Sequence, residues 1–329
     1  MEQAFIKDIF KINDRKTFRA AALEVFHFQA EYCPVYKDYL AALSVDPSRI
    51  KEPEEIPFLP IEFFKSHTVI EEKKKAEIVF ESSGTTGTDP SRHHVADAGL
   101  YRESFLRSFY SFYGSPEELC ILALLPSYLE RSGSSLVYMM DHLIRWSNHP
   151  DSGFYLDQLE ELSSILKKRN NDNHPTLLMG VSFALLDLAE QHPMSLWNNI
   201  SVMETGGMKG RREELVRSEL HQLLKKAFDL NSVHSEYGMT ELLSQAYSVE
   251  AGLFQSPPWM KVLIRDPNDP LSLLSPGRSG GINIIDLANI HSCSFIATGD
   301  LGKVYEDGSF EVQGRYDHSD IRGCNLLVS

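Results

Sequence analysis

A run of small, hydroxyl-bearing residues follows an apolar segment in the first third of the chain. Ile78–Phe80 is typical of a β-strand, and the loop after it reads Ser82-Ser83-Gly84-Thr85-Thr86-Gly87-Thr88. Glycine lets backbone N–H groups turn toward one point and hydroxyls add donors, so this loop suits a phosphate group. It lacks the spacing of a Walker A loop. Taken alone, it is more typical of a plain surface turn.

Three later stretches supply what a nucleotide site needs besides a phosphate loop. Tyr237-Gly238-Met239-Thr240-Glu241 offers an aromatic face, a hydroxyl and a carboxylate within five residues. Thr298-Gly299-Asp300 predicts a turn that carries a carboxylate, and Gly314-Arg315-Tyr316-Asp317 places a cation beside a carboxylate. Each also has an ordinary structural explanation, as a strand-end tyrosine, a turn cap or a surface cation. Their order along the chain is the specific signal.

The composition excludes several classes of protein. The chain has 329 residues, 42% of them hydrophobic, so a substantial core can form. A formal charge of −14 argues against a nucleic-acid surface, which needs a basic field. We find no apolar run long enough to span a membrane and no signal-peptide core at the start.

The cysteines and histidines predict neither a disulfide frame nor a metal centre. Four cysteines are scattered without CxxC spacing, which is typical of reduced thiols in a cytoplasmic protein. His93-His94 is the only adjacent histidine pair, and we interpret it as a polar surface turn.

The elements that must position these groups alternate between strand and helix. We predict strands at Cys120–Leu125, Thr176–Val181, Ser201–Glu204 and Val233–Glu236, and helices at Lys16–Tyr32, Ala96–Tyr113, Ser132–Ile144, Ser182–Gln191 and Arg211–Phe228. The prolines between Cys33 and Lys65 predict an irregular segment. This pattern indicates an α/β sheet whose ligands lie at the carboxyl ends of the strands.

The chain is expected to divide into two regions. Residues 1–251 form the α/β nucleotide- and acyl-binding region. From residue 252 to 329 the pattern changes to short β-like runs separated by proline and glycine, which predicts a smaller β-rich subdomain that ends at the Gly-Arg motif and a cysteine tail.

Together, the motifs resemble those of the adenylate-forming superfamily of acyl-CoA synthetases, luciferases and peptide-synthetase adenylation domains. The resemblance runs from about Tyr32 to the C-terminus, with the four motifs in the family's order. It implies that a carboxylate is joined to the α-phosphate of ATP with release of pyrophosphate, with Mg²⁺ as the accompanying ion.

The resemblance also implies a role for each matching residue. The Ser82–Thr88 loop would hold the β- and γ-phosphates, Thr240 the α-phosphate and Glu241 the Mg²⁺. Tyr237-Gly238 and Gly206-Gly207 would lie against adenine. Asp300 would accept hydrogen bonds from the ribose hydroxyls, and Arg315 would contact the ribose or a phosphate.

Two departures from the superfamily pattern stand out. The phosphate loop continues as Asp89-Pro90-Ser91-Arg92 where Pro-Lys is usual, so that Arg92 could replace the lysine. Only Tyr316–Ser329 follow Arg315, so we expect the large N-terminal domain of the fold without its usual C-terminal domain and that domain's lysine.

One naturally short branch fits better, the acyl-protein synthetase (LuxE-type) family. Leu125–Met139, Thr205–Lys209 and Ile321–Cys324 resemble that family. It implies a fatty acid substrate, acyl transfer to Cys324 as a thioester, and an acyl reductase as partner. Arg322 would lower the pKa of the Cys324 thiol.

Two alternatives stay open. Cys33-Pro34-Val35-Tyr36 and Arg322-Gly323-Cys324-Asn325 are similar to phenylacetate-CoA ligases, which would need a C-terminal domain from another chain. The other alternative is a nucleotide-binding scaffold without catalytic activity.

Overall fold

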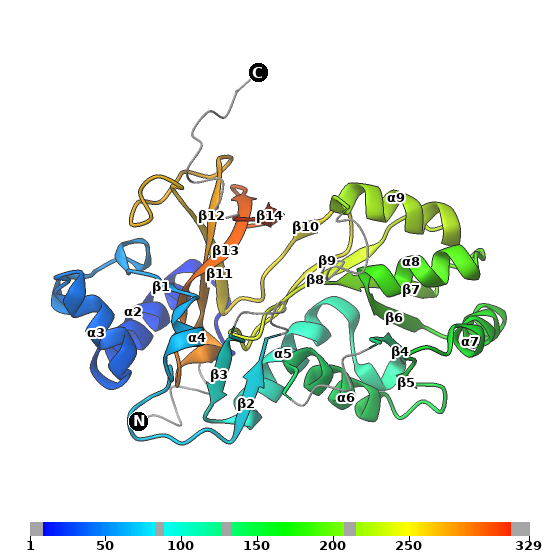
Figure 1. Cartoon of the computed structure of the whole chain (residues 1–329), viewed down its shortest axis with the longest axis horizontal. Helices are drawn as coiled ribbons and strands as arrows, with labels where there is room; N and C mark the ends of the chain where they lie inside the picture. The colour runs from blue at the N-terminus through cyan, green and yellow to red at the C-terminus, as the bar shows by residue number, and fades with distance from the viewer. Residues whose placement is uncertain (1–8, 83–88, 127–132, 207–214, 317–329) are drawn as a thin grey trace. The chain divides into compact units, whose positions relative to one another are not determined.

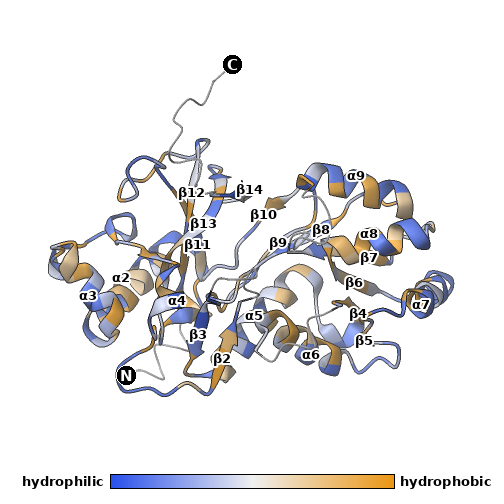
Figure 2. Cartoon of the chain, viewed as in Figure 1, coloured by the Kyte–Doolittle hydropathy of each residue, from blue (hydrophilic) through white to orange (hydrophobic). Residues whose placement is uncertain are grey.

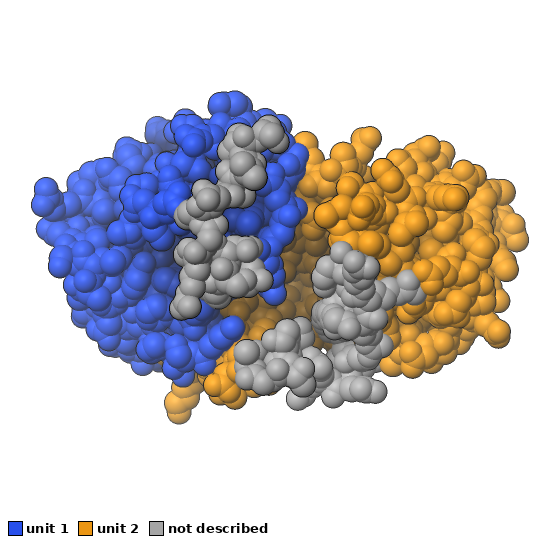
Figure 3. All heavy atoms as spheres, turned by 45° about the horizontal axis from the view of Figure 1, so that its top comes forward, with its two compact units in different colours: residues 1–73, 258–329 blue, residues 74–257 orange. Residues whose placement is uncertain are grey.

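The computed structural model describes residues 9–82, 89–126, 133–206 and 215–316. The chain forms two compact units, coloured separately in Figure 3. We call Lys74–Pro257 the central unit, and Met1–Lys73 together with Pro258–Ser329 the terminal unit. Each is described by itself below.

A mainly parallel sheet forms the core of the central unit (Figure 1). Its strand order is β5-β4-β6-β7-β8-β9, and β9 alone runs antiparallel to its neighbour. Every residue of β4 and β6 is buried, as expected for strands covered on both faces. The strands of this unit after residue 100 are β4 (Cys120–Leu124), β5 (Gly153–Phe154), β6 (Thr176–Val181), β7 (Ile200–Thr205), β8 (His234–Tyr237), β9 (Ala246–Ser248) and β10 (Leu253–Phe254).

Helices cover both faces of this sheet. Figure 1 shows α8 and α9 on one face and α5 and α6 on the other. The helices are α5 (Ala98–Tyr113), α6 (Ser135–Ser147), α7 (Leu159–Asp172), α8 (Ser182–Gln191) and α9 (Arg217–Phe228). Within the described ranges, no helix has the length and apolar content needed to cross a membrane.

A two-stranded hairpin precedes the sheet and carries the glycine-rich loop. β2 (Ile78–Glu81) pairs antiparallel with β3 (Arg92–Val95). Figure 2 shows β2 coloured hydrophobic and β3 coloured hydrophilic. The loop residues 83–88 lie outside the described residues, so the hairpin defines only the base from which that loop starts.

An antiparallel sheet forms the core of the terminal unit. β14, β13, β12 and β11 lie side by side in that order, and β1 pairs parallel with β13. Phe26 of α2 packs edge-on to Phe295 of β13, with ring centroids 6.0 Å apart. The elements are α2 (Arg15–Tyr32), α3 (Pro34–Ala42), α4 (Phe63–Ser66), β1 (Leu59–Pro60), β11 (Met260–Arg265), β12 (Ser279–Asp286), β13 (Phe295–Val304) and β14 (Phe310–Arg315).

A buried glutamine links α2 to the segment between β12 and β13. The side chain of Gln29 is fully buried, and its Nε2 donates to the carbonyls of Asn289 and Ile290 at 3.0 and 2.8 Å. Its Oε1 accepts from the backbone N–H of Ser294 at 2.9 Å. One side chain thus satisfies three buried backbone groups that lie more than 250 residues away in sequence.

The predicted elements of the central unit are confirmed, most of them to within a few residues. Some predictions for the terminal unit are wrong. The segment after Cys33 forms α3, because Pro34 occupies the first helical position, where its missing N–H costs nothing. The β-like runs after residue 252 are not all short, because Phe295–Val304 form one continuous strand, β13.

The division of the chain differs from the expected one. The change of unit at Pro257–Pro258 lies close to the expected boundary at residue 251. Residues 1–73, however, belong with the C-terminal sheet and not with the α/β sheet. The physical reason is long-range pairing, such as β1 with β13 and Gln29 with Asn289, which a pattern along the sequence does not reveal.

Gln29→Leu should destabilise the protein by about 3 kcal/mol or more, because three buried backbone groups would lose their partner at about 1–3 kcal/mol each. Arg19→Ala on the same helix is the control, since Arg19 forms an exposed ion pair with Glu52 and its loss should change stability little. Chemical denaturation of both variants measures the difference. Equal stabilities would show that Gln29 does not hold α2 in place.

Candidate functional site

The neighbouring strands β7 and β8 bring two of the predicted motifs to one edge of the central sheet. Thr205 and Glu236 are register partners in this parallel pair. β7 ends at Thr205, and β8 ends one residue after Glu236, at Tyr237. Gly206 therefore follows β7 beside the start of the Tyr237-Gly238 turn. The Gly206 carbonyl accepts a hydrogen bond from Ser182 Oγ at 2.8 Å, and Gly207 lies outside the described residues.

Tyr237 ends β8 as a largely buried aromatic residue. It is 8% exposed, and its ring centroid lies 5.8 Å from that of Phe254. The guanidinium of Arg217 lies 4.9 Å from the centre of the same Phe254 ring. Tyr237 is thus the strand-end tyrosine that the structural explanation predicted, and its stacking on adenine stays a prediction.

Glu236 explains why glycine follows Tyr237. A Cβ atom at Gly238 would lie 2.4 Å from Glu236 Oε1, so no larger residue fits without moving that carboxyl group. Glu236 also accepts a hydrogen bond from Thr205 Oγ1 at 2.5 Å. The glycine of this motif therefore lets the buried carboxyl group behind it keep its position.

Two buried carboxyl groups occupy opposite faces of the sheet at this edge. Glu236 lies on the α5 face, paired across β8–β9 with Tyr247, whose ring is 5.4 Å from Tyr113 of α5. Burial, with a contribution from the charge of Glu204, raises the pKa of Glu236 to about 7, although the Thr205 hydrogen bond lowers it. Sequence analysis missed Glu236, since a single acid at a strand end carries no distinct signal.

Glu204 on the α9 face has charged and polar partners. Arg217 Nε donates to Glu204 Oε1 at 2.9 Å, and His221 Nε2 lies 3.5 Å from the same oxygen. Burial opposes the charge of Glu204, but the hydrogen bond with His221 and the charge of Arg217 lower its pKa overall. The two carboxyl groups are therefore shifted in opposite directions.

Thr240 and Glu241 follow in a turn, in which the Leu242 N–H donates to the Met239 carbonyl at 3.2 Å. Glu241 is buried and Thr240 is half-buried. The carbonyl oxygen of Thr240 lies 2.8 Å from Nδ1 of His93. This contact joins the predicted α-phosphate and metal residues to the hairpin that carries the phosphate loop.

Two hydrogen bonds between Ser82 and Ser91 hold the base of that loop. The Ser82 N–H donates to the Ser91 carbonyl at 3.0 Å, and the Ser91 N–H donates to Ser82 Oγ at 2.9 Å. Of the predicted loop, only Ser82 is among the described residues. Arg92, which could replace the usual lysine, forms an exposed ion pair with Glu81 at 3.1 Å.

The interpretation of His93-His94 as a surface turn is wrong. Both residues lie in β3, and the His93 side chain is fully buried. Burial alternates along this segment, with one face formed by Ser91, His93 and Val95. This period-two pattern was the available signal, but it is short and polar, and so resembles a turn.

Asp300 and Arg315 lie in the terminal unit, where they face each other across β13 and β14. Arg315 Nε lies 3.3 Å from Asp300 Oδ1, and the arginine side chain is 86% exposed while that of the aspartate is 11% exposed. The predicted turn at Thr298–Asp300 is wrong, since all three residues are inside β13. A register shift beside Gly314 marks a bulge just before Arg315.

The three cysteines in the described ranges, Cys33, Cys120 and Cys293, are all buried. Burial raises the pKa of Cys33 and of Cys120 to about 11, and it also raises the pKa of Cys293 well above its ordinary value. Such thiols are poor nucleophiles because the thiolate is the reactive form. Cys324 lies outside the described residues.

The described residues include no cluster of three or more His, Cys, Asp or Glu that could hold a metal ion. Mg²⁺ is commonly bound by one or two carboxylates together with substrate phosphates and water. Glu241 supplies one buried carboxylate beside Thr240, the predicted α-phosphate residue, so it could hold a Mg²⁺ ion that arrives with a nucleotide.

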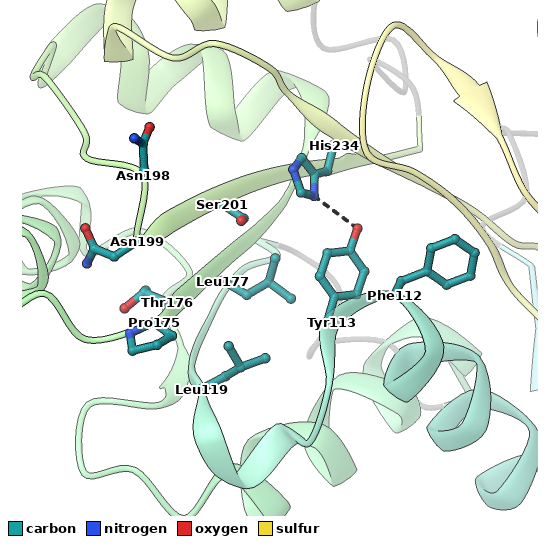
Figure 4. Close-up of a pocket in the computed structure, with 10 residues that line it drawn as sticks. All are labelled: Phe112, Tyr113, Leu119, Pro175, Thr176, Leu177, Asn198, Asn199, Ser201 and His234. Carbon is teal, nitrogen blue, oxygen red and sulfur yellow. Dashed lines mark hydrogen bonds between the residues drawn. The ribbon is translucent and has the colours of Figure 1, made fainter.

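A pocket opens at the opposite edge of the same sheet, where the strands begin (Figure 4). Thr176, Ser201 and His234 line it from the starts of β6, β7 and β8, and Tyr113 Oη lies 3.2 Å from His234 Nδ1. Ligands of such sheets bind at the carboxyl ends of the strands, so the pocket lies at the wrong edge for the candidate site.

Solved structures with a similar fold are adenylate-forming acyl-CoA ligases. ATP-bound MatB from Rhodopseudomonas palustris has a TM-score of 0.55 and 16% identity, over 72% of this chain and 47% of that one. A 2-hydroxyisobutyryl-CoA ligase in complex with 2-HIB-AMP and CoA has a TM-score of 0.67 and 15% identity, over 92% and 68%. Its open conformation gives 0.65 and 12%, over 92% and 70%.

These similarities confirm the predicted α/β fold of the adenylate-forming ligases. The chain spans about half of the length of MatB, 47%. No protein-family model matches the sequence, and no curated protein sequence matches it.

The two buried carboxyl groups predict opposite responses to pH. The pKa of Glu236 is raised from 4.5 in the unfolded chain to about 7 in the folded protein. The contribution of this carboxyl group to the free energy of unfolding is therefore fully present below pH 4.5 and is lost as the pH rises through 7. Relative to wild type, Glu236→Gln should gain roughly 1.4 kcal/mol of unfolding free energy between about pH 6 and pH 8. Denaturant unfolding at both pH values measures this gain.

Glu204→Gln is the matched control on the opposite face. Because the pKa of Glu204 is lowered, its contribution is present above its unfolded pKa and is lost only in acid. This variant should therefore be less stable than wild type at both pH values. A pH-independent effect of Glu236→Gln would show that Glu236 is not buried as described.

Proposed function

We propose that the protein activates a carboxylic acid, using ATP and Mg²⁺, as an acyl-adenylate. The observation that carries the proposal is the convergence at one sheet edge. Gly206, the Tyr237–Glu241 turn and the hairpin that carries the Ser82–Thr88 loop belong to one unit, and the turn and hairpin are joined through Thr240 and His93. The fold shared with acyl-CoA ligases supports the same chemistry.

The reaction brings together two anions, the carboxylate and ATP. The site must therefore offset their charge and hold them in line. A carboxylate oxygen attacks the α-phosphorus of ATP, and the bond to the departing pyrophosphate breaks. Donors from the loop and a Mg²⁺ ion on Glu241 would offset the charge, and Thr240 would hold the α-phosphate in line. Asp300, which forms an ion pair with the exposed Arg315, would accept hydrogen bonds from the ribose.

The acyl group would then pass to the thiol of Cys324. The thiolate attacks the acyl carbon and AMP departs, which leaves a thioester. The three buried cysteines support this assignment by exclusion, because their raised pKa values make them poor acceptors. A fatty acid as substrate and an acyl reductase as the next acceptor follow from the resemblance to acyl-protein synthetases.

Glu241→Gln should lower acid-dependent pyrophosphate exchange by roughly 10²–10³-fold, because it removes one charge that stabilises the transition state. The assay uses wild type with a panel of aliphatic and aromatic acids, and exchange with at least one acid is the expected result. Glu250→Gln, at an exposed acid of the same unit, is the control and should retain full activity.

Unchanged activity of Glu241→Gln would remove this residue from the metal site. Nucleotide binding by wild type without exchange for any acid would support the scaffold alternative over the enzyme.

Cys324→Ser should abolish acylation of the protein yet retain pyrophosphate exchange, because adenylation and transfer are separate steps. Wild type incubated with ATP and a fatty acid should gain one acyl mass that neutral hydroxylamine releases. Intact-mass spectrometry measures the adduct, and Cys33→Ser, at a buried thiol, should label as wild type does. Acylation of added coenzyme A in place of the protein would favour the phenylacetate-type CoA ligase.

A further inference from the structure

His93 is a buried polar residue, and its ring nitrogens therefore need hydrogen-bond partners within the protein. Its side chain is fully buried on β3, beside Phe80 of β2, which is its register partner and also buried. Its Nδ1 lies 2.8 Å from the carbonyl oxygen of Thr240, 147 residues further along the chain. A buried imidazole without such a bond would cost folding free energy, so the contact is a fixed part of the core.

The acceptor determines where the proton lies. A backbone carbonyl oxygen can only accept, so Nδ1 of His93 must carry a hydrogen and donate it. The bond therefore fixes the Nδ1–H form of the ring. It also fixes the carbonyl of Thr240, and with it the backbone from which the Thr240 side chain and the Glu241 side chain extend.

His93 also has a fixed position relative to the base of the phosphate loop. Two residues before it, Ser91 forms two hydrogen bonds with Ser82, at the base of the loop. The chain from Ser82 through Ser91 to His93 and on to Thr240 is thus a continuous set of short contacts within one unit. It joins the residue that precedes the loop to the turn that carries the predicted metal ligand.

We propose that His93 is a positioning residue that sets the spacing between the base of the phosphate loop, at Ser82 and Ser91, and the Thr240–Glu241 turn. This inference rests on the proposed function, in which the loop holds the leaving pyrophosphate and the turn holds the α-phosphate and Mg²⁺. In-line displacement requires these parts to be aligned, and a misplacement of about 1 Å can cost roughly 10²-fold in rate. His93 itself contacts no reacting atom in this account.

The test compares two substitutions of different geometry. In His93→Asn the side-chain amide can place an N–H near the position of Nδ1, whereas His93→Leu fills the space without a donor. His93→Leu should lower kcat for pyrophosphate exchange by about 10²-fold with little change in the KM for the acid, and His93→Asn should stay within about 10-fold of wild type. His94→Asn is the matched control, because it makes the same change at the half-buried neighbour in β3.

Thermal melting of each variant separates positioning from folding. Comparable melting of the Asn and Leu variants with a large difference in kcat supports the inference. Equal kcat values for the two variants, or full activity of His93→Leu, would overturn it. If His93→Leu does not fold, His93→Gln replaces it, since its longer amide cannot occupy the Nδ1 position.

Two further measurements distinguish failure of this inference from failure of the proposed function. If wild type supports no exchange with any acid, the proposed function fails, and the affinity for MgATP becomes the measurement that tests His93. Weaker binding of MgATP by His93→Leu than by His93→Asn supports the spacing role. Equal binding by the two variants overturns it. Nitrogen-15 spectra of ring-labelled histidine should show the Nδ1–H form in wild type, with its signal lost in His93→Asn. The Nε2–H form alone would contradict the hydrogen bond.

Discussion

The parallel pairing of β7 with β8 is the constraint on which the rest of the site depends. With Thr205 opposite Glu236, the two strands end at nearly the same height, and the backbone after each strand leaves the sheet at one edge. A slip of one residue would turn every side chain to the opposite face. Glu204 would then lose Arg217, and Glu236 would lose Thr205. The register is therefore enforced by the cost of leaving buried polar groups without partners.

The burial of polar groups at this edge of the sheet explains why glycine follows Tyr237, which the pattern of residues along the sequence does not. A glycine in the turn after Tyr237 leaves room for the Glu236 carboxyl group, which occupies the space of a side chain. The carboxyl group is held there by Thr205 from the neighbouring strand, and its raised pKa reflects how completely water is excluded. The turn is thus supported from beneath by buried side chains, as its proposed role of holding an anion in a fixed orientation requires.

Much of the fold could be predicted from the sequence, but less of the site. The strands and helices of the central unit follow from local periodicity, and β6 and α8 match the predicted bounds. Contacts between segments that are distant in sequence could not be predicted. The pairing of β1 with β13 places residues 1–73 in the terminal unit. The contact of His93 with Thr240 makes the polar strand β3 part of the core. Thr298–Asp300 was mistaken for a turn because Thr-Gly-Asp fits turn chemistry, but the three residues lie inside β13, at a register shift with β12, and Asp300 pairs with Arg315 of β14.

The Asp300–Arg315 pair shows how a weak interaction can suit a binding role. The Asp300 side chain is largely buried, and its Oδ1 lies 3.3 Å from Nε of the exposed Arg315. An ion pair with one exposed partner contributes little to stability. Each oxygen of a carboxylate can accept more than one hydrogen bond. In the proposed function, a ribose hydroxyl would use one of these acceptor positions on Asp300. The pairing of β13 with β14 sets the position of the Asp300 backbone opposite Arg315, whose side chain is largely exposed.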